Sequence, residues 1–459
     1  MYKQLVEILH GKKILILGFG REGISSYKFI RKILPEISLT IADKDKNVLN
    51  NIDFILDDNC QTILGKSYIS YLDNFDLIIK TPGIPNNLLK DKVSQNKITS
   101  QTDLFLQLFS LNTIGVTGTK GKSTTSSLIR HILSYYHKDV VLIGNIGVPP
   151  FDMIEKIGKE TRVVFELSSY QLENISVSPH IAVILNLFQE HLDHYENFDG
   201  YQSAKFNITK FQTKNDWVIF NADDPSVNEM IAKSGFTGES LEFSSEKEIN
   251  AGAFLNREGN IVFKQNKNIS EFDFNNRLYL PGRHNLMNIM AAVCACKLLE
   301  IPDNIISEAI SGFKGLEHRL EYIGKFGNIH FYNDSIATVP EATIEAVKTL
   351  KTVDTLILGG KDRGIDYSKL ARFINQSDIT NLIFTGEAGK RILEEVEAIG
   401  ISNKKKYFLI TRFDKIKQII KQYTKPGYIC LLSPAASSYD MFKNFEERGE
   451  AFKKIARNI

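Results

Sequence analysis

The strongest chemical signal in the sequence is the glycine-rich segment Thr-Gly-Thr-Lys-Gly-Lys-Ser at residues 117–123. It follows an apolar run that predicts a strand and it opens a helical stretch, as phosphate-binding loops do. Its glycines let backbone N–H groups converge on phosphate oxygens, Lys122 can reach the β and γ oxygens, and Ser123 can bind Mg²⁺. The strict spacing is broken once, because Val116 stands where glycine is usual and Gly115 lies one residue early. The segment predicts a nucleoside triphosphate site, and the alternative is an ordinary glycine-rich turn before a helix.

A second glycine-rich turn, Gly18-Phe19-Gly20-Arg21-Glu22-Gly23, lies near the N-terminus. It also follows an apolar run, and Asp43 stands at the end of the next predicted strand. This is the spacing of a Rossmann fingerprint, in which the turn cradles a diphosphate and the acid holds a ribose or base. It does not specify nicotinamide, since a nucleotide diphosphate sugar meets the same geometry. The alternative is a turn with no ligand.

Acidic and imidazole groups follow two predicted strands of the middle part of the chain. Glu166 ends the run at 162–166, and Glu190-His191-Leu192-Asp193-His194 follows the run at 181–186. Ligand crevices of open α/β sheets lie at the carboxyl ends of strands. Beside a phosphate loop, a carboxylate there most often holds Mg²⁺, which prefers oxygen ligands. For His191, a ligand role and a packing role are equally compatible with the spacing.

The elements that position these groups form three series of short apolar runs that alternate with helix-period segments, the rhythm of βαβ units. We predict an α/β protein of three domains: a Rossmann-like domain over residues 1–105, a central domain with a P-loop ATPase-like parallel sheet over 106–315, and a C-terminal Rossmann-like domain over 316–459. Residues 240–280 alternate polar and apolar side chains and predict an antiparallel excursion of the central domain. The runs lie at 13–18, 39–43 and 76–83, then at 113–118, 140–144, 162–167, 181–186 and 217–221, and finally at 354–360, 381–386 and 428–434.

The composition fits a globular protein of several domains, with 459 residues, 43% hydrophobic residues and a net charge of +2. Near-neutral charge gives no general drive towards nucleic acid or anionic membrane. Four cysteines are too few for a disulfide framework, and we expect all of them, including Cys294 and Cys296, to be core residues. No run reaches the length of a membrane span or resembles a signal peptide. We expect a cytoplasmic monomer that binds small molecules, without nucleic-acid or membrane partners.

Motifs spread over the whole chain occur in one order that resembles the Mur ligase family, and within it the members that add D-glutamate. The resemblance implies an ATP-dependent amide ligase of peptidoglycan precursor synthesis. ATP would phosphorylate the carboxylate of UDP-N-acetylmuramoyl-L-alanine, and the amine of D-glutamate would attack the acyl phosphate. The segments that carry the resemblance are 81–85 (TPGIP), 117–123 (TGTKGKS), 144–147 (GNIG), 166–173 (ELSSYQLE), 190–193 (EHLD), 203–205 (SAK), 284–288 (HNLMN), 316–319 (LEHR), 333–335 (NDS), 432–435 (LSPA) and 443–449 (KNFEERG).

The resemblance also assigns residues. It implies ATP and two Mg²⁺ ions as cofactors, and a carbamate formed from CO₂ on Lys205, which would turn that cation into an oxygen donor. The catalytic residues would be Lys122, Glu166, His191 and Lys205, and the metal ligands Ser123, Glu166, His191 and carbamylated Lys205. The ATP-binding residues would be Gly118, Thr119, Lys120, Gly121, Lys122, Ser123, Thr124, Asn288, Arg319 and Asp334. The UDP-substrate would contact Gly18, Gly20, Arg21, Glu22, Asp43, Gly83, Asn145 and His191, and D-glutamate would contact Thr338, Arg363, Ser438 and Phe445.

Three positions depart from this family pattern or leave it ambiguous. Ile336 stands where lysine is usual, so a positive charge is missing, and we hypothesise that Lys361 supplies it from a neighbouring loop. Lys361 and Arg363 compete for the D-glutamate carboxylate, and register favours Arg363, whose guanidinium can grip a carboxylate in two places. Tyr439 replaces a smaller aliphatic residue and would trim the glutamate pocket.

Three alternatives remain at this stage. Another amide ligase of the superfamily, adding L-alanine, a diamino acid, a dipeptide or folate-linked glutamate, would share the phosphate loop and the metal ligands. It is disfavoured by the glycine-rich first domain and by the lack of an Asp-Asn-Pro-Arg-like signature. An NAD-dependent oxidoreductase would leave the phosphate loop and Glu166 without a role. A nucleotide-binding regulator without catalysis is disfavoured by the intact set Lys122, Glu166, His191 and Lys205.

Overall fold

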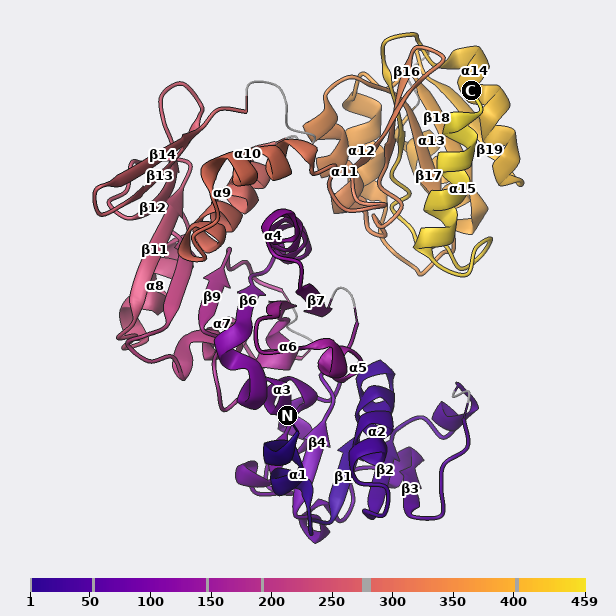
Figure 1. The fold of residues 1–459 in the computed structure, drawn as a ribbon. Coiled ribbons are helices and arrows are strands. Elements are labelled where there is room, and N and C mark those ends of the chain that lie inside the picture. The colour runs from indigo at the N-terminus through magenta and orange to yellow at the C-terminus, as the bar shows by residue number, and fades with distance from the viewer. Residues whose placement is uncertain (1, 52–53, 146–147, 191–193, 275–281, 401–403) are drawn as a thin grey trace. The chain divides into compact units, whose positions relative to one another are not determined.

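The computed structural model describes residues 2–51, 54–145, 148–190, 194–274, 282–400 and 404–459. The chain forms two compact units, of which the first comprises residues up to 276 together with 283–311, and the second is built mainly from residues 312–459. Three β-sheets carry the architecture, two in the first unit and one in the second (Figure 1). The prediction of an α/β protein with three sheets is confirmed.

The N-terminal sheet is parallel and has the strand order β3-β2-β1-β4-β5. Alternate strand residues face opposite layers, as the period of a strand requires. Ile14 and Ile16 pack in the same core as residues of the helices, whereas Leu15 and Leu17 pack against Phe75 and neighbouring loop residues. The elements are α1 (Lys3–Leu9), β1 (Ile14–Leu17), α2 (Arg21–Ile33), β2 (Leu39–Asp43), β3 (Cys60–Leu64), β4 (Leu77–Lys80), β5 (Ile98–Thr99) and α3 (Gln101–Phe109).

The central sheet has the order β14-β13-β12-β11-β10-β9-β6-β8-β7. Its strands from β7 to β12 pair in parallel, and β12, β13 and β14 pair antiparallel, so the predicted antiparallel excursion is confirmed and extends the same sheet. The strands are β6 (Thr113–Thr117), β7 (Val140–Gly144), β8 (Arg162–Glu166), β9 (Ile181–Ile184), β10 (Trp217–Asn221), β11 (Glu239–Ser244), β12 (Gly252–Leu255), β13 (Ile261–Gln265) and β14 (Asn268–Phe272). The helices are α4 (Lys122–Tyr136), α5 (Pro150–Met153), α6 (Ser169–Leu172), α7 (Phe198–Lys210), α8 (Pro225–Lys233), α9 (Arg283–Leu298) and α10 (Asp303–Gly312).

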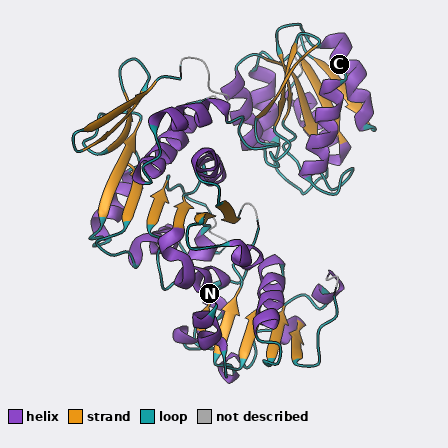
Figure 2. Ribbon diagram, viewed as in Figure 1, coloured by secondary structure: helices purple, strands orange, loops and turns teal. Residues whose placement is uncertain are grey.

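The sheet of the second unit has the order β15-β16-β20-β17-β18-β19, with only the β15 and β16 pair antiparallel. Helices cover both of its faces (Figure 2). Leu356 and Leu358 of β17 share a core with α11, α12 and α13, whereas Ile357 between them faces α14 and α15. The elements are β15 (Glu321–Phe326), β16 (Ile329–Asn333), α11 (Pro340–Leu350), β17 (Val353–Gly359), α12 (Ser368–Gln376), β18 (Asn381–Thr385), α13 (Gly386–Ile399), β19 (Lys406–Ile410), α14 (Ile416–Tyr423), β20 (Ile429–Leu432) and α15 (Phe445–Arg457).

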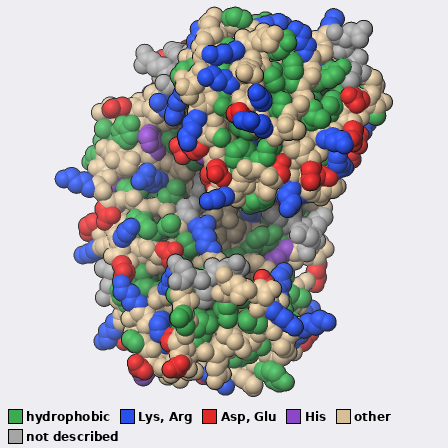
Figure 3. Space-filling model, turned by 90° about the vertical axis from the view of Figure 1, so that its right-hand side faces the viewer, with side chains coloured by type: hydrophobic (Ala, Val, Ile, Leu, Met, Phe, Trp, Pro, Cys, Tyr) green, Lys and Arg blue, Asp and Glu red, His purple; other side chains and the backbone are tan. Residues whose placement is uncertain are grey.

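Three of the cysteines, Cys294, Cys296 and Cys430, are buried core residues as expected. The expectation is wrong for Cys60, which is only half-buried because it begins the edge strand β3. Acidic and basic side chains intermingle over the face shown in Figure 3, in keeping with the near-zero net charge. Within the described residues, no helix is both long and apolar enough to span a bilayer.

Candidate functional site

The phosphate loop joins β6 to α4, as the sequence predicts. Gly118 and Gly121 have φ of +149° and +86°, and Gly121 is the residue before the first turn of α4. A Cβ on Gly121 would lie 2.4 Å from the side-chain oxygen of Asn288, so glycine is required both by conformation and by space. Asn288, on α9, also accepts a hydrogen bond from Thr125 Oγ1 at 3.2 Å. The structure therefore brings Asn288 directly against the loop.

Gly115 has a different reason to be glycine. It lies inside β6, where an added Cβ would come within 2.7 Å of Pro179 Cγ and 3.0 Å of Leu167 Cδ1. Close packing on the sheet face fixes this residue, so it takes no part in cradling phosphate. The departure from the strict motif spacing leaves the loop itself intact.

A second polar residue, Asn186, holds the loop by hydrogen bonds and lies just after the neighbouring strand β9. Asn186 accepts a hydrogen bond from the Lys120 N–H at 2.8 Å and donates one to the Lys120 carbonyl at 3.0 Å. The Lys122 ammonium donates to the carbonyls of Gly118 and Thr119, each at 3.0 Å. Lys120 forms an ion pair with Glu190. The sequence reading missed Asn186, although a polar residue just after a buried strand is a signal that could have found it.

Glu166 ends β8 beside the loop and its side chain is completely buried. Its Oε1 accepts a hydrogen bond from Asn145 Nδ2 at 2.9 Å. Its Oε2 is buried and has no hydrogen-bond partner among the described residues. A buried carboxylate oxygen without a partner is costly, and a bound cation is the usual remedy. A carboxylate oxygen in this position is the kind of ligand that Mg²⁺ prefers.

Lys205 is the second buried charge of this region. It lies on α7 with only 2% of its surface exposed, and its Nζ donates to the Gly118 carbonyl at 2.9 Å. The ammonium also lies over the ring of Tyr201, 4.8 Å from its centre. Burial, and secondarily the charge of Lys122, lowers the pKa of Lys205 well below its usual range. A solvated helix lysine is thereby ruled out.

The first glycine-rich turn opens α2 at the end of β1. Gly23 must be glycine, because a Cβ there would lie 2.2 Å from the Gly18 carbonyl oxygen. The Asp43 carboxylate accepts a hydrogen bond from the Phe19 N–H at 2.7 Å, which fixes it against the turn. Gly20 and Arg21 line an open cavity of about 630 Å³ at this point. Its size suits a small ligand.

Two of the predicted ATP residues belong to the second unit. Asp334 follows β16, accepts from Ser433 Oγ at 2.8 Å and from the Leu320 N–H at 3.1 Å, and is buried. Burial raises the pKa of Asp334 to about 7, and the nearby charge of Arg319 opposes that rise. Arg319 is exposed on the turn before β15.

Three loops at the carboxyl ends of the second unit's strands are tied together by Arg448 of α15. Its side chain is 2% exposed, and its guanidinium donates to Ser335 O at 2.7 Å, Ala436 O at 3.0 Å and Gly359 O at 3.3 Å. Its Nε donates to Ser335 Oγ at 3.0 Å. Burial lowers the pKa of Arg448 to about 10, so it remains charged near neutrality. The sequence reading gave Arg448 no role of its own.

These loops carry the residues predicted to bind D-glutamate. Ser438 is buried and Thr338 is half-buried, while Phe445 begins α15 and its carbonyl accepts from Ser335 Oγ at 2.8 Å. Arg363 is exposed, and Lys361 lies nearby with its N–H on the Ser437 carbonyl at 2.9 Å. The competition between these two basic residues therefore stays open.

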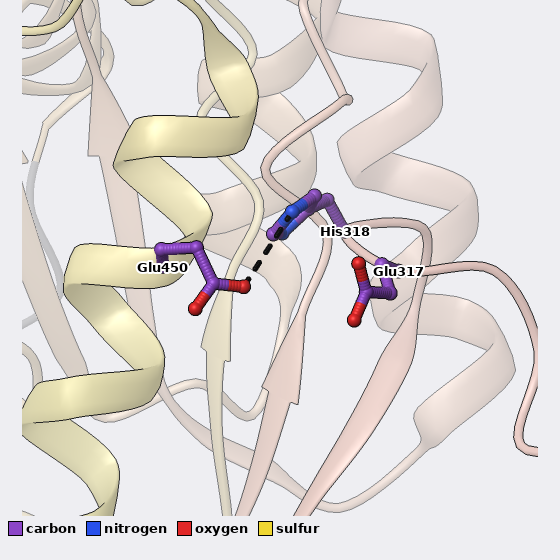
Figure 4. A group of neighbouring side chains, drawn as sticks. All are labelled: Glu317, His318 and Glu450. Atoms are coloured by element: carbon purple, nitrogen blue, oxygen red, sulfur yellow. Dashed lines mark ion pairs between the residues drawn. The ribbon is translucent and has the colours of Figure 1, made fainter.

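One group in the second unit has the spacing of metal ligands. Glu317, His318 and Glu450 offer ligand atoms within 4.8 Å of one another (Figure 4). The Lys453 ammonium already lies among them, 3.3 Å from the Glu317 carboxylate and 2.9 Å from that of Glu450. A resident cationic side chain supplies the positive charge, so we read the cluster as an ion-pair network.

The predicted residues therefore fall into three sets within the described structure. The predicted uridine-site residues lie at the turn after β1, at the end of β2 and after β4 of the N-terminal sheet. The phosphate loop, Asn145, Glu166, Lys205 and Asn288 meet at the carboxyl ends of the central strands. Arg319, Asp334 and the D-glutamate candidates lie in the second unit. His191 lies outside the described residues, so the predictions made for it stay predictions.

Comparisons with known proteins find relatives along the whole chain. Residues 116–296 match the family profile described as the Mur ligase middle domain. The chain is 34% identical to the UDP-N-acetylmuramoylalanine--D-glutamate ligase of Clostridioides difficile (strain 630), with 98% of this chain and 99% of the relative covered. It is also 34% identical to the ligase of that name from Clostridium acetobutylicum, with 100% and 99% covered. Among solved structures, the UDP-N-acetylmuramate-alanine ligase MurC of Thermotoga maritima has the same fold, with a TM-score of 0.56, 19% identity, and 96% and 98% covered.

Proposed function

The chain belongs to the Mur ligase family, and we propose that its phosphate loop, Glu166 and Lys205 carry out the ATP-dependent joining of D-glutamate to UDP-N-acetylmuramoyl-L-alanine. The activity itself follows from full-length similarity to ligases of that name. It places the protein in peptidoglycan precursor synthesis. We propose that it works as a cytoplasmic monomer.

The reaction makes an amide from a carboxylate, which is a poor electrophile at neutral pH. Transfer of the γ-phosphoryl group of ATP to the alanine carboxylate gives an acyl phosphate and ADP. The D-glutamate amine then attacks the acyl carbon, the carbon–oxygen bond to phosphate breaks, and the nitrogen loses a proton. Catalysis is therefore mainly positioning and charge neutralisation.

The residues of the phosphate loop would hold the ATP phosphates. The loop leads directly into the N-terminus of α4, and helix N-termini favour anions. Lys122 would move from the Gly118 and Thr119 carbonyls to the β and γ oxygens, and Asn186 would keep the loop in shape during that exchange. Asn288, Arg319 and Asp334 would hold the adenosine part.

The fit to Mg²⁺ rests on the buried Oε2 of Glu166 next to the loop, for which the described part of the chain provides no hydrogen-bond partner. Ser123 and Glu166 would hold one ion, and His191 and carbamylated Lys205 a second. When bound, Mg²⁺ would neutralise the phosphate charge that builds up during transfer. Asn145 would orient Glu166 through its 2.9 Å hydrogen bond and would reach the muramoyl substrate with its other groups.

Carbamylation of Lys205 would relieve an unfavourable environment. The side chain is buried, the charge of Lys122 opposes its own, and its Nζ donates to a backbone carbonyl of the loop. Addition of CO₂ would replace this ammonium with an anionic oxygen donor. A ¹³C resonance of a carbamate after equilibration with ¹³C-bicarbonate, absent in Lys205→Gln, would test this independently of turnover.

The remaining residues would bind the two other substrates. Gly18, Gly20, Arg21, Glu22, Asp43 and Gly83 would hold the uridine diphosphate. The cavity at Gly20 and Arg21 and the fixed Asp43 carboxylate support this. Thr338, Arg363, Ser438 and Phe445 would hold D-glutamate, on loops that Arg448 ties together.

The single observation that carries the proposal is the buried Glu166 oxygen, which has no partner among the described residues and lies beside an intact phosphate loop. The test is phosphate release from ATP with UDP-N-acetylmuramoyl-L-alanine and, in turn, D-glutamate, L-glutamate, L-alanine and a diamino acid. We expect release that depends on D-glutamate, and at least a hundredfold loss in Glu166→Gln. Release with a different amine would overturn the amine specificity.

A further inference from the structure

A buried network of the charged side chains Lys80, Glu173 and His194 connects the N-terminal sheet with the central sheet. Lys80, the last residue of β4, has 1% of its side chain exposed, and its Nζ lies 3.0 Å from Glu173 Oε2. The other oxygen of Glu173 lies 2.6 Å from His194 Nε2. Glu173 and His194 are also buried, with 6% and 9% of their side chains exposed. Both carboxylate oxygens are thus bound, one from each side.

At the Lys80 end, this network holds the loop that follows β4. Lys80 Nζ donates to the Ile84 carbonyl at 2.7 Å, so the lysine closes the loop 81–85 onto its own strand. That loop contains Gly83, which the proposed function places at the uridine diphosphate. The same loop packs on the first glycine-rich turn, because Thr81 Oγ1 donates to the Leu17 carbonyl at 3.1 Å.

At the His194 end, the network reaches the phosphate loop. The His194 ring lies against Tyr170 and Tyr195, at 4.3 Å and 4.8 Å between ring centres. Tyr195 in turn packs edge-on against Tyr201, whose hydroxyl is 3.0 Å from Thr119 Oγ1 of the phosphate loop. A continuous path of packed and hydrogen-bonded groups therefore runs from the loop after β4 to the loop that would hold ATP.

A second buried contact runs in parallel. Gln171 of α6 donates to Glu22 Oε1 of the first glycine-rich turn at 2.8 Å. The first glycine-rich turn is thus bound to α6, and the loop 81–85 is bound through Lys80 to Glu173, the residue after α6. In contrast, the pair Lys32 and Glu155 also joins the N-terminal and central sheets at 2.6 Å but is 61% and 51% exposed. The molecule therefore contains a matched surface pair with no loop attached.

Stability does not explain a buried pair of this kind. Taking two charges out of water costs about as much as their attraction returns, and apolar pairs of the same size often stabilise more. A buried pair does fix one geometry, because any other arrangement leaves a charge without a partner. The substrate of the proposed reaction must reach from the uridine pocket to the γ-phosphate, so the spacing of these two loops determines whether its carboxylate arrives in line.

We propose that Lys80 is a positioning residue, which through Glu173 and His194 sets the uridine-binding loop relative to the phosphate loop. This inference deepens the proposed function and rests on it. Loss of the contact between Lys80 and Glu173 should therefore weaken binding of the muramoyl substrate and leave ATP binding unchanged. The reason is that the proposed ATP site lies on only one side of this network.

The test compares Lys80→Met with Lys32→Met. The first removes the buried ammonium and keeps a side chain of similar length, and the second removes a matched exposed one. We expect the KM for UDP-N-acetylmuramoyl-L-alanine to rise roughly tenfold or more in Lys80→Met, with the KM for ATP within about twofold of wild type. Lys32→Met should leave both constants unchanged. Fluorescence of Trp217, the single tryptophan, reports unfolding of the first unit and checks that each variant is folded.

The inference is overturned if folded Lys80→Met has an unchanged KM for the muramoyl substrate, or if both KM values rise together. If Lys80→Met does not fold, Glu173→Gln gives the same test, since it keeps the shape and removes the charge; an unchanged KM there also overturns the inference. Calorimetric titration of the muramoyl substrate without ATP separates the two proposals. A wild type that binds the substrate and forms no amide would refute the function, while the affinity of Lys80→Met would still test the link.

Discussion

Replacement of Arg448 by methionine should loosen the loops of the second unit without emptying its core. Methionine keeps much of the apolar stem, and the change removes the guanidinium that donates to the carbonyls of Ser335, Gly359 and Ala436. A fourth hydrogen bond, from Nε to Ser335 Oγ, is lost as well. At a net contribution of about 1 kcal/mol each, the loss of the four should lower the free energy of unfolding by about 4 kcal/mol. The variant no longer has to bury a charge, and this saving in desolvation energy makes the value an upper limit for the loss of stability.

The assay is urea unfolding followed by far-ultraviolet circular dichroism and by Trp217 fluorescence. Trp217 lies in β10 of the first unit, so its transition should stay in place while the circular dichroism change of the second unit moves to lower urea. Arg412→Met is the control, because Arg412 is 72% exposed and pairs with Asp414 at 2.9 Å on the surface. It should cost less than about 0.5 kcal/mol.

Arg448→Lys separates charge from geometry. An ammonium keeps the positive charge, but a single nitrogen does not reach three separate carbonyls as a planar guanidinium does. We expect a stability between those of wild type and Arg448→Met, and a raised KM for D-glutamate in both variants. Stability of Arg448→Met equal to that of Arg412→Met would refute the reasoning.

Three further predictions concern Gly121, Asp334 and Lys361. Gly121→Ala forces a φ of +86° on an L-residue and places its Cβ 2.4 Å from Asn288 Oδ1, so it should abolish ATP binding measured by calorimetry. Retained affinity for ATP would contradict the loop geometry. Because burial raises the pKa of Asp334 from 3.8 to about 7, the folded protein holds a proton that the unfolded chain releases, so stability should fall as pH rises through this window. The fall is up to about 4 kcal/mol, and Asp334→Asn should remove that slope in urea unfolding. If Lys361 supplies the charge missing at Ile336, Lys361→Met should lower turnover roughly tenfold in wild type and far less in an Ile336→Lys background; equal losses would exclude the compensation.

The elements that the sequence predicted well are those with strong local signals. Buried parallel strands read as short apolar runs, and β17 is predicted at 354–360 and observed at Val353–Gly359. The phosphate loop could be predicted because its glycines are set by positive φ, which is a local property. The edge strand β3 is absent from the predicted runs, since an edge position leaves Cys60 half-buried and weakens the apolar pattern.

The interactions that the sequence could not show are those between distant segments. The burial of Lys205, the clamp of Asn186 on Lys120, and the contacts of Arg448 with residues about a hundred positions away depend on how strands are ordered in the sheets. A lysine or arginine pattern alone predicts a solvated surface residue. Only the fold reveals that Lys205 and Arg448 are enclosed and donate hydrogen bonds to backbone carbonyls.

The central claim is that the protein activates the alanine carboxylate as an acyl phosphate before the amide forms. The most direct test uses UDP-N-acetylmuramoyl-L-alanine labelled with ¹⁸O in both carboxylate oxygens, together with ATP and D-glutamate, and mass spectrometry of the products. We expect one ¹⁸O in the released phosphate and one in the new amide, with no product from L-glutamate. Unlabelled phosphate would show that water attacks ATP, and would contradict the account.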